Sequence, residues 1–203
     1  MSLSDIDIRP AFEQLFIEQV GISASEFAQL KDRFRVKRIP RRGFHLRAGE
    51  VTLHTAYVNK GCSRSYTVDE KGKEHVLFFG FEDWWLGDIE SYVTQRPGKQ
   101  YIEAVEDLEL LCITQPEFED FSRRFPAVGR WHQGIQTKMA FAMINRLIEV
   151  KSCTPEERML ALVKQRPDIF QRVALRDIAS YLDIEPPSLS RMRRRVLPID
   201  RTS

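Results

Sequence analysis

Hydrophobic positions follow a two-residue period in the first half of the chain. Within CSRSYTVD (62–69), Tyr66 and Val68 alternate with polar neighbours, as in a strand that is buried on one face. Similar short segments, rich in β-branched and aromatic residues, are VTLHTAYVN (51–59), EHVLFFGF (74–81) and YIEAVEDLELLCIT (101–114). Glycines separate these segments at short intervals, and DEKGKE (69–74) has the composition of a hairpin connection. The pattern predicts an antiparallel sandwich or barrel over residues 39–114.

Helical spacing flanks the predicted sheet. Before the sheet, ISASEFAQLKDRF (22–34) predicts a helix whose N-cap is Ser23 or Ser25. After it, a pattern from about 128 to 150 follows Pro126 and predicts one long helix. The heptad-like seam of this helix consists of Trp131, Ile135, Met139, Ala142, Arg146 and Glu149, flanked by Met143, Leu147 and Ile148. An apolar stripe of this length must be buried, either on the chain's own sheet or against a second copy, and the sequence leaves both open.

From Thr154 onward the pattern predicts short helices with tight breaks between them. Thr154 is placed as an N-cap, with Glu157 completing a capping box. In LRDIASYLDIEPPSLSRMRRR (175–195), the small Ala179 stands among apolar residues, Asp183 lies at a turn and Pro186 suits a first helical position. The apolar anchors are Ile178, Leu182, Ile184 and Leu189. This spacing predicts a helix-turn-helix, in which a small residue allows close contact between two rigidly packed helices.

Cations and hydroxyl groups gather around the second helix of this motif. The candidate DNA-binding residues are Arg176, Ser188, Ser190, Arg191, Arg194 and Arg195. Guanidinium and hydroxyl groups hydrogen-bond phosphates and guanine edges. An arginine run alone would rather indicate a partner for the helix dipole or a solvated face. Its combination with the anchor spacing favours DNA reading.

Composition narrows the class of protein further. The chain has 203 residues, of which 42% are hydrophobic, and its formal net charge of +2 does not by itself imply a polyanionic partner. Its three cysteines are dispersed, which favours a reducing cytoplasm over a disulfide framework. The start MSLSDIDIRP lacks the basic and apolar segments of a signal peptide, and no apolar run approaches the roughly 18 residues of a membrane span. We therefore expect a cytoplasmic protein without a membrane partner, and, since no nucleophile has a recognisable partner, no enzyme.

The order of sheet, long helix and terminal helix-turn-helix resembles the Crp–Fnr family of bacterial transcription regulators. The segments that carry the resemblance are RRGFHLRAGE (41–50), YVNKGCSRSYTVDEKGKEH (57–75), WWLGDIESYVTQRPGKQYIEAVED (84–107) and 175–195, the last being similar to a subgroup common in Bacteroidetes. The resemblance implies an α+β fold. Its parts are a jelly-roll-like antiparallel β-roll of the cyclic-nucleotide-binding type (1–125), a dimerisation helix and hinge (126–152) and a winged helix-turn-helix (153–203). It also implies a homodimer on a double-stranded DNA operator, with RNA polymerase as a further partner.

The cyclic-nucleotide cassette departs from this resemblance. In relatives that bind cyclic AMP, a Glu accepts a hydrogen bond from the ribose and an Arg pairs with the cyclic phosphate; here Asp88 and Gly98 stand at those positions. Lys99 could supply charge, but without the bidentate geometry of an arginine. The ligand-pocket candidates are Gly87, Asp88, Lys99 and Gln100. We predict that the protein does not bind cyclic AMP in the usual way. An unidentified small-molecule effector, or none, stays open, and no cofactor is assigned.

Other sensors and functions fit the residues less well. Three dispersed cysteines cannot hold an iron–sulfur cluster, a single His in GFHLRAGE cannot form a cupin metal site, and no histidine has the context of a haem ligand.

Pro187 stands where many relatives carry a base-reading Glu, so the operator should differ from theirs. Trp84 and Trp85, beside the cassette, could cover the pocket, meet polymerase or complete the core. The alternative to DNA reading is a ligand-binding regulatory module that acts only through protein contacts.

Overall fold

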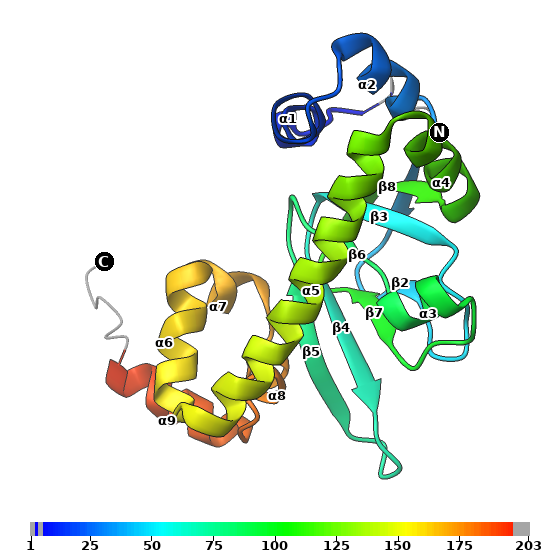
Figure 1. Cartoon of the computed structure of the whole chain (residues 1–203). Helices are drawn as coiled ribbons and strands as arrows, with labels where there is room; N and C mark the ends of the chain where they lie inside the picture. Colours follow the sequence, from blue (N-terminus) through cyan, green and yellow to red (C-terminus); the bar gives the residue numbers. More distant parts are fainter. Residues whose placement is uncertain (1–2, 4–5, 197–203) are drawn as a thin grey trace.

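The computed structural model describes residue 3 and residues 6–196, and it combines two antiparallel sheets with helices at both ends of the chain (Figure 1). The N-terminal helical segments are α1 (Pro10–Gln14), the π-helical η2 (Leu15–Val20) and α2 (Ala24–Lys31). The strands are β1 (Arg35–Ile39), β2 (Phe44–Leu46), β3 (His54–Lys60), β4 (Ser63–Val68), β5 (Glu74–Gly80), β6 (Trp85–Leu86), β7 (Tyr101–Ala104) and β8 (Leu108–Thr114). The remaining helices are α3 (Ile89–Thr94), α4 (Gln115–Arg124), α5 (Pro126–Ser152), α6 (Pro155–Gln165), α7 (Ile169–Arg172), α8 (Leu175–Tyr181) and α9 (Pro186–Val196).

The two sheets form the antiparallel β-roll that the family resemblance implied, where the two-residue period had predicted a sandwich or barrel. Their strand orders are β1-β8-β3-β6 and β2-β7-β4-β5. Residues 69–73 of the predicted hairpin segment connect β4 and β5, and the Asp69 N–H donates to the Lys73 carbonyl at 3.0 Å. Between β3 and β4 the chain needs Gly61, because its φ is 95° and a Cβ there would collide with the Asp107 carbonyl. Apolar side chains from both sheets, such as Val58 and Ile102, fill the space inside the roll.

An aromatic cluster joins the N-terminal helices to the roll. Ser23 is the N-cap of α2, and Glu26 completes a capping box with it. In the cluster, the ring centroid of Trp85 lies 5.3 Å from that of Tyr57 and 5.2 Å from that of Trp131. Trp85 is only 8% exposed, so it completes the core, whereas Trp84 is 39% exposed.

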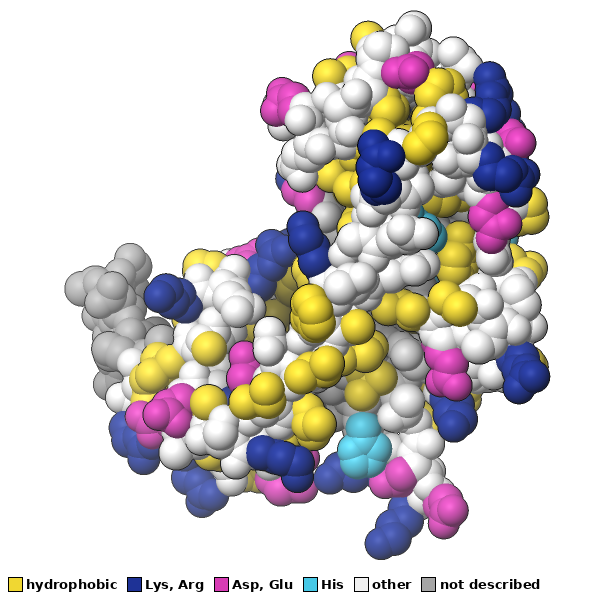
Figure 2. Space-filling model, viewed as in Figure 1, with side chains coloured by type: hydrophobic (Ala, Val, Ile, Leu, Met, Phe, Trp, Pro, Cys, Tyr) yellow, Lys and Arg dark blue, Asp and Glu magenta, His cyan; other side chains and the backbone are white. Residues whose placement is uncertain are grey.

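Helix α5 crosses the molecule from the N-terminal helices to the C-terminal ones and carries two different faces (Figure 1). The predicted seam faces the chain's own roll and α8, with Trp131 in the aromatic cluster and Arg146 over the ring of Tyr181 at 4.2 Å. The unpartnered stripe lies on the opposite face of α5, and Figure 2 shows hydrophobic side chains gathered there. Its members, with their exposed fractions, are Phe141 (59%), Ile144 (53%), Leu147 (58%) and Ile148 (54%). Intramolecular packing therefore uses the seam itself. The stripe open to a second chain contains Leu147 and Ile148 of the predicted flank together with Phe141 and Ile144, which were not predicted.

The C-terminal helices form the predicted helix-turn-helix, without strands among the described residues from 153 to 196. Thr154 caps α6, and Glu157 completes the capping box. The wing was expected within 153–203, of which residues 197–203 are outside the described part of the chain. Among the residues that the structure describes, no helix has the length and hydropathy to cross a lipid bilayer.

Candidate nucleic-acid interface and sensor pocket

The helix-turn-helix is held by the anchors that the sequence placed around Ala179. Ala179, Ile178 and Leu189 are fully buried at the contact between α8 and α9. Asp183 adopts a left-handed conformation with φ at 54° in the turn, and the Ile184 N–H donates to the Ala179 carbonyl at 3.0 Å. Pro186 is the first residue of α9, where a missing N–H costs nothing. These contacts fix the direction in which α9 presents its outer face.

The outer face of α9 brings together part of the predicted DNA-binding set. Pro187, Arg191 and Arg194 are exposed and follow one another at three- and four-residue spacing. Two weak contacts order the arginines, from Arg191 Nη2 to Ser188 Oγ and from Arg194 Nε to the Ser190 carbonyl, each at 3.4 Å. The surface is therefore cationic and lined with hydroxyl groups, as a phosphate- and base-reading face requires.

Three other arginines near this face have different surroundings. Arg195 forms an ion pair with Glu156 of α6, so its charge is partly used within the domain. Arg193 lies over the ring of Phe170 at 4.6 Å and covers the core of the domain. Arg176, at the start of α8, is 72% exposed in its side chain and lies along the edge of the motif. Arg195 and Arg176 thus each have an acidic partner, Glu156 and Asp177 respectively, while both side chains stay largely exposed.

Helix α8 is fastened to the edge strand β5 of the roll. Ser180 Oγ accepts from the Val76 N–H at 3.0 Å and donates to the Glu74 carbonyl at 2.9 Å. This one hydroxyl therefore pairs two backbone groups, the Val76 N–H and the Glu74 carbonyl, at a sheet edge that has no neighbouring strand. Beside it, Arg64 of β4 is 4% exposed and contacts Asp177 at 2.9 Å. The remaining partners of Arg64 are Glu74 and Glu103, both at 2.6 Å.

A second arginine joins the end of α5 to the turn of the helix-turn-helix. Arg158 is 8% exposed, and its two terminal nitrogens donate to three backbone carbonyls. These carbonyls belong to Val150 (3.2 Å), Cys153 (2.8 Å) and Leu182 (2.7 Å). Because Leu182 directly precedes the turn, Arg158 ties the position of α9 to the last turn of α5.

The cassette residues do not converge on one ligand-sized space. Asp88 is buried and caps α3, since its Oδ1 accepts from the Ser91 N–H at 3.1 Å. Gln100 Oε1 accepts from Ser65 Oγ at 2.7 Å, and Lys99 is exposed. Gly87 and Gln100 line a cavity between the roll and α5. Its volume is only about 30 Å³, which holds about two water molecules.

The two buried arginines, Arg64 and Arg158, were not predicted from the sequence. Arg64 looks like an ordinary strand residue, and its carboxylate partners are Glu74, Glu103 and Asp177, of which Asp177 is more than a hundred positions away. Arg158 sits in the first turns of an amphipathic helix, where an arginine is normally solvated. No local signal identifies either, because their partners come from elements that meet only in the folded chain. The capping boxes, by contrast, have partners three residues apart and could be read directly.

Compared by sequence, the chain matches no protein-family model and no curated protein. Solved structures with the same arrangement are found at low identity. FixK2 from Bradyrhizobium japonicum is 16% identical over 80% of this chain and 84% of that one, with a TM-score of 0.69. The c-di-GMP-responsive regulator CLP from Xanthomonas campestris is 13% identical (86% and 91% covered, TM-score 0.65). A Crp/Fnr-family transcriptional regulator from Eubacterium rectale is 13% identical (92% and 86% covered, TM-score 0.66). The chain therefore has the fold of the Crp/Fnr transcription regulators, with a β-roll, a long central helix and a C-terminal helix-turn-helix.

Proposed function

We propose that the protein is a homodimeric, sequence-specific DNA-binding transcription regulator. The observation that carries the proposal is the exposed face of α9, where Arg191 and Arg194 project from a helix held rigidly by buried anchors. In this proposal residues 1–125 are the sensor, 126–152 the dimerisation helix and hinge, and 153–203 the DNA-binding domain. RNA polymerase is the further partner that the resemblance implies.

The proposed reading mode follows the usual geometry of the motif. Helix α9 enters the major groove with its N-terminal residues toward the bases, and α8 crosses the backbone. Arg191 then reads a guanine or binds a nearby phosphate, while Arg176, Arg194 and the hydroxyls of Ser188 and Ser190 contact phosphates. Pro187 offers only an apolar surface, which suits a thymine methyl group.

The proposed dimer places two copies of α9 at two half-sites. The exposed stripe of α5 supports it, because four large apolar side chains on one long helix are costly to leave in water. A second copy of the same helix would cover them in a two-fold interface, in which each residue meets the same patch of its partner. The operator would then be roughly palindromic.

The sensor is proposed not to bind cyclic AMP in the usual way. The carboxylate of Asp88 is already used as a helix cap, and a Cβ at position 98 would meet Asp88 Oδ2 at 2.5 Å, so no arginine fits there as the chain is folded. Calorimetric titration with cyclic AMP and cyclic GMP, with Asp88→Ala as a control, tests this. We expect no saturable heat with either nucleotide. A saturable heat that disappears in Asp88→Ala would restore cyclic-nucleotide sensing.

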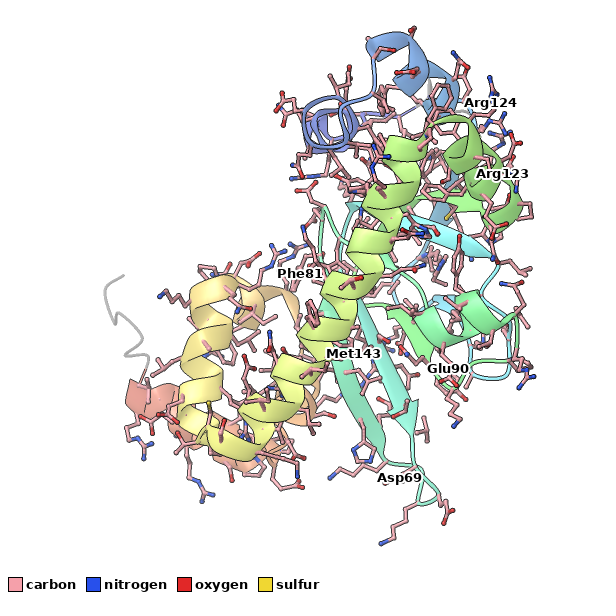
Figure 3. The ribbon with its side chains drawn as sticks, in the orientation of Figure 1. Asp69, Phe81, Glu90, Arg123, Arg124 and Met143 are labelled. Carbon is pink, nitrogen blue, oxygen red and sulfur yellow. The ribbon has the colours of Figure 1, made fainter. Side chains whose placement is uncertain are left out.

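DNA binding is tested on duplexes selected from a random library. Fluorescence anisotropy should give an affinity that falls with salt, because phosphate contacts release counterions. Arg191→Ala should weaken binding to the selected duplexes by about 1–3 kcal/mol and relax specificity at one base position. Arg194→Ala should reduce the slope of log affinity against log salt concentration by about 1. Arg123→Ala, an exposed arginine of α4 labelled in Figure 3, is the matched control. Salt-independent or undetectable DNA binding would favour the protein-contact module instead.

A further inference from the structure

A cavity bordered by α5 and α6 lies outside the cassette, at the junction of the roll and the helix-turn-helix. Its walls come from strand β5 and the loop after it, α5, α6 and the end of α8, and its volume is about 300 Å³. That volume is ten times the 30 Å³ of the cavity at the cassette and reaches the range of small-molecule sites. Figure 3 labels Phe81, one of its wall residues, on the side of α5 that faces α6.

Aromatic rings form much of the wall. They belong to Phe78, Phe79, Phe81, Trp84 and Tyr181. The rings of Phe79 and Tyr181 are 5.3 Å apart, and guanidinium groups already lie over two of the rings, with Arg146 at 4.2 Å from Tyr181 and Arg166 at 4.5 Å from Phe81. A flat, apolar molecular body would therefore find ring faces and edges to pack against.

The charge around the cavity is positive. Three arginines and one carboxylate, Glu149, line it. Glu149 pairs with Arg146 at 3.5 Å, whereas Arg166 forms no ion pair within 4.0 Å with any described residue. Two cationic groups thus remain in excess over acidic ones, which favours an anionic occupant.

One buried donor in the wall has no acceptor. The terminal nitrogens of Arg158 are taken by backbone carbonyls, but its Nε has no hydrogen-bond partner among the described residues. Arg158 is more than nine-tenths buried, so this N–H is shielded from bulk water. Because this nitrogen has almost no accessible surface, an occupant of the cavity does not reach it, which leaves Arg166 as the wall cation without a carboxylate partner among the described residues.

We propose that this cavity binds a small aromatic carboxylate, with its ring among the aromatic side chains and its carboxylate at Arg166. The wall of the cavity adjoins the helix-turn-helix, because Arg158 holds the Leu182 carbonyl and Arg146 contacts the Tyr181 carbonyl and ring. An occupant would therefore stabilise one placement of α9 relative to α5. This last step, unlike the binding itself, rests on the proposed function.

Isothermal titration calorimetry of the full chain tests the site with 1-naphthaleneacetate and indole-3-acetate, each against its neutral amide. At least one carboxylate should bind saturably, at least tenfold more tightly than its amide. Arg166→Gln should weaken binding about tenfold, while Arg123→Gln on α4 should leave it unchanged. Absence of saturable binding by both acids, or equal affinity for acid and amide, would overturn the proposal.

The indole N–H resonances locate the bound molecule. Trp84 lines this cavity and two others along α5, whereas Trp85 and Trp131 line only the others. We expect the Trp84 resonance to shift most; larger shifts of Trp85 and Trp131 would place the ligand elsewhere and refute the site. DNA affinity without ligand, measured on the unmodified protein and on Arg166→Gln, separates the two proposals. If neither binds DNA, the proposed function fails, while the ligand site is still decided by calorimetry.

Discussion

At the scale of single residues, Asp183 shows how a local backbone conformation fixes the turn between α8 and α9. Its φ of 54° is one that non-glycine residues adopt at a cost. Asp183→Gly should therefore leave stability unchanged or raise it by up to about 1 kcal/mol, whereas Asp183→Val should lower it by about 1–3 kcal/mol. Urea unfolding of both variants measures this. Equal stability of the Val variant and the unmodified protein would show that the turn is not left-handed.

His45 gives a residue-scale prediction on pH. Burial, and then the neighbouring Lys37 and His54, lower the pKa of His45 to about 3. The unfolded chain, with an ordinary pKa near 6.5, takes up this proton first, so stability should decrease as the pH falls from about 6.5 toward 3. Urea unfolding at about pH 7 and about pH 5 should show a smaller decrease in His45→Asn than in the unmodified protein. The other histidines and the carboxylates are common to both proteins, so an identical decrease would contradict the low pKa.

At the scale of elements, α5 serves two partners with two faces. Its seam packs on the roll, and Phe141, Ile144 and Ile148 form an exposed stripe at three- and four-residue spacing. Ile144→Glu places a charge in the centre of the proposed two-fold interface, so sedimentation velocity should show a shift from dimer to monomer. Val93→Glu is the matched control, since Val93 is equally exposed, at 60%, but lies on α3. A dimer that survives Ile144→Glu, or a monomeric unmodified protein, would contradict the assignment of this face.

At the scale of the whole molecule, buried charge couples the roll to the helix-turn-helix. Arg64 (4% exposed) joins β4 to Asp177 of α8, and burial raises the pKa of Asp177 even beside this cation. Arg64→Met would remove the buried cationic partner of Glu103 and leave Asp177 only the exposed Arg176, so we expect a loss of about 3–5 kcal/mol and a split of the unfolding transition into two. Asp177→Asn, which keeps the shape and an acceptor, should cost less. Differential scanning calorimetry that shows one unshifted transition in Arg64→Met would exclude this coupling.

The sequence by itself determined the elements whose signals are local. Capping boxes at Thr154, hairpin composition at 69–74 and the anchors around Ala179 each involve residues within a few positions of one another, so spacing alone predicts them. The same holds for the exposed face of α9, since a helix repeats every 3.6 residues once its buried anchors are known. The alternation of the strands predicted an antiparallel sandwich or barrel, and the resemblance in sequence segments and element order implied the β-roll and the fold class.

Only the tertiary structure decided which face of α5 is occupied, how α8 is fastened to β5 and where a ligand-sized cavity lies. These features depend on pairs such as Arg64 with Asp177 and Arg158 with Leu182, whose partners lie 113 and 24 positions apart. A periodic pattern shows that a stripe must be buried, but it cannot say against what, because the energy of burial is not directional. The position of Trp85 in the core and the diversion of Arg195 to Glu156 follow from the same cause: each is settled by neighbours that only the folded chain supplies.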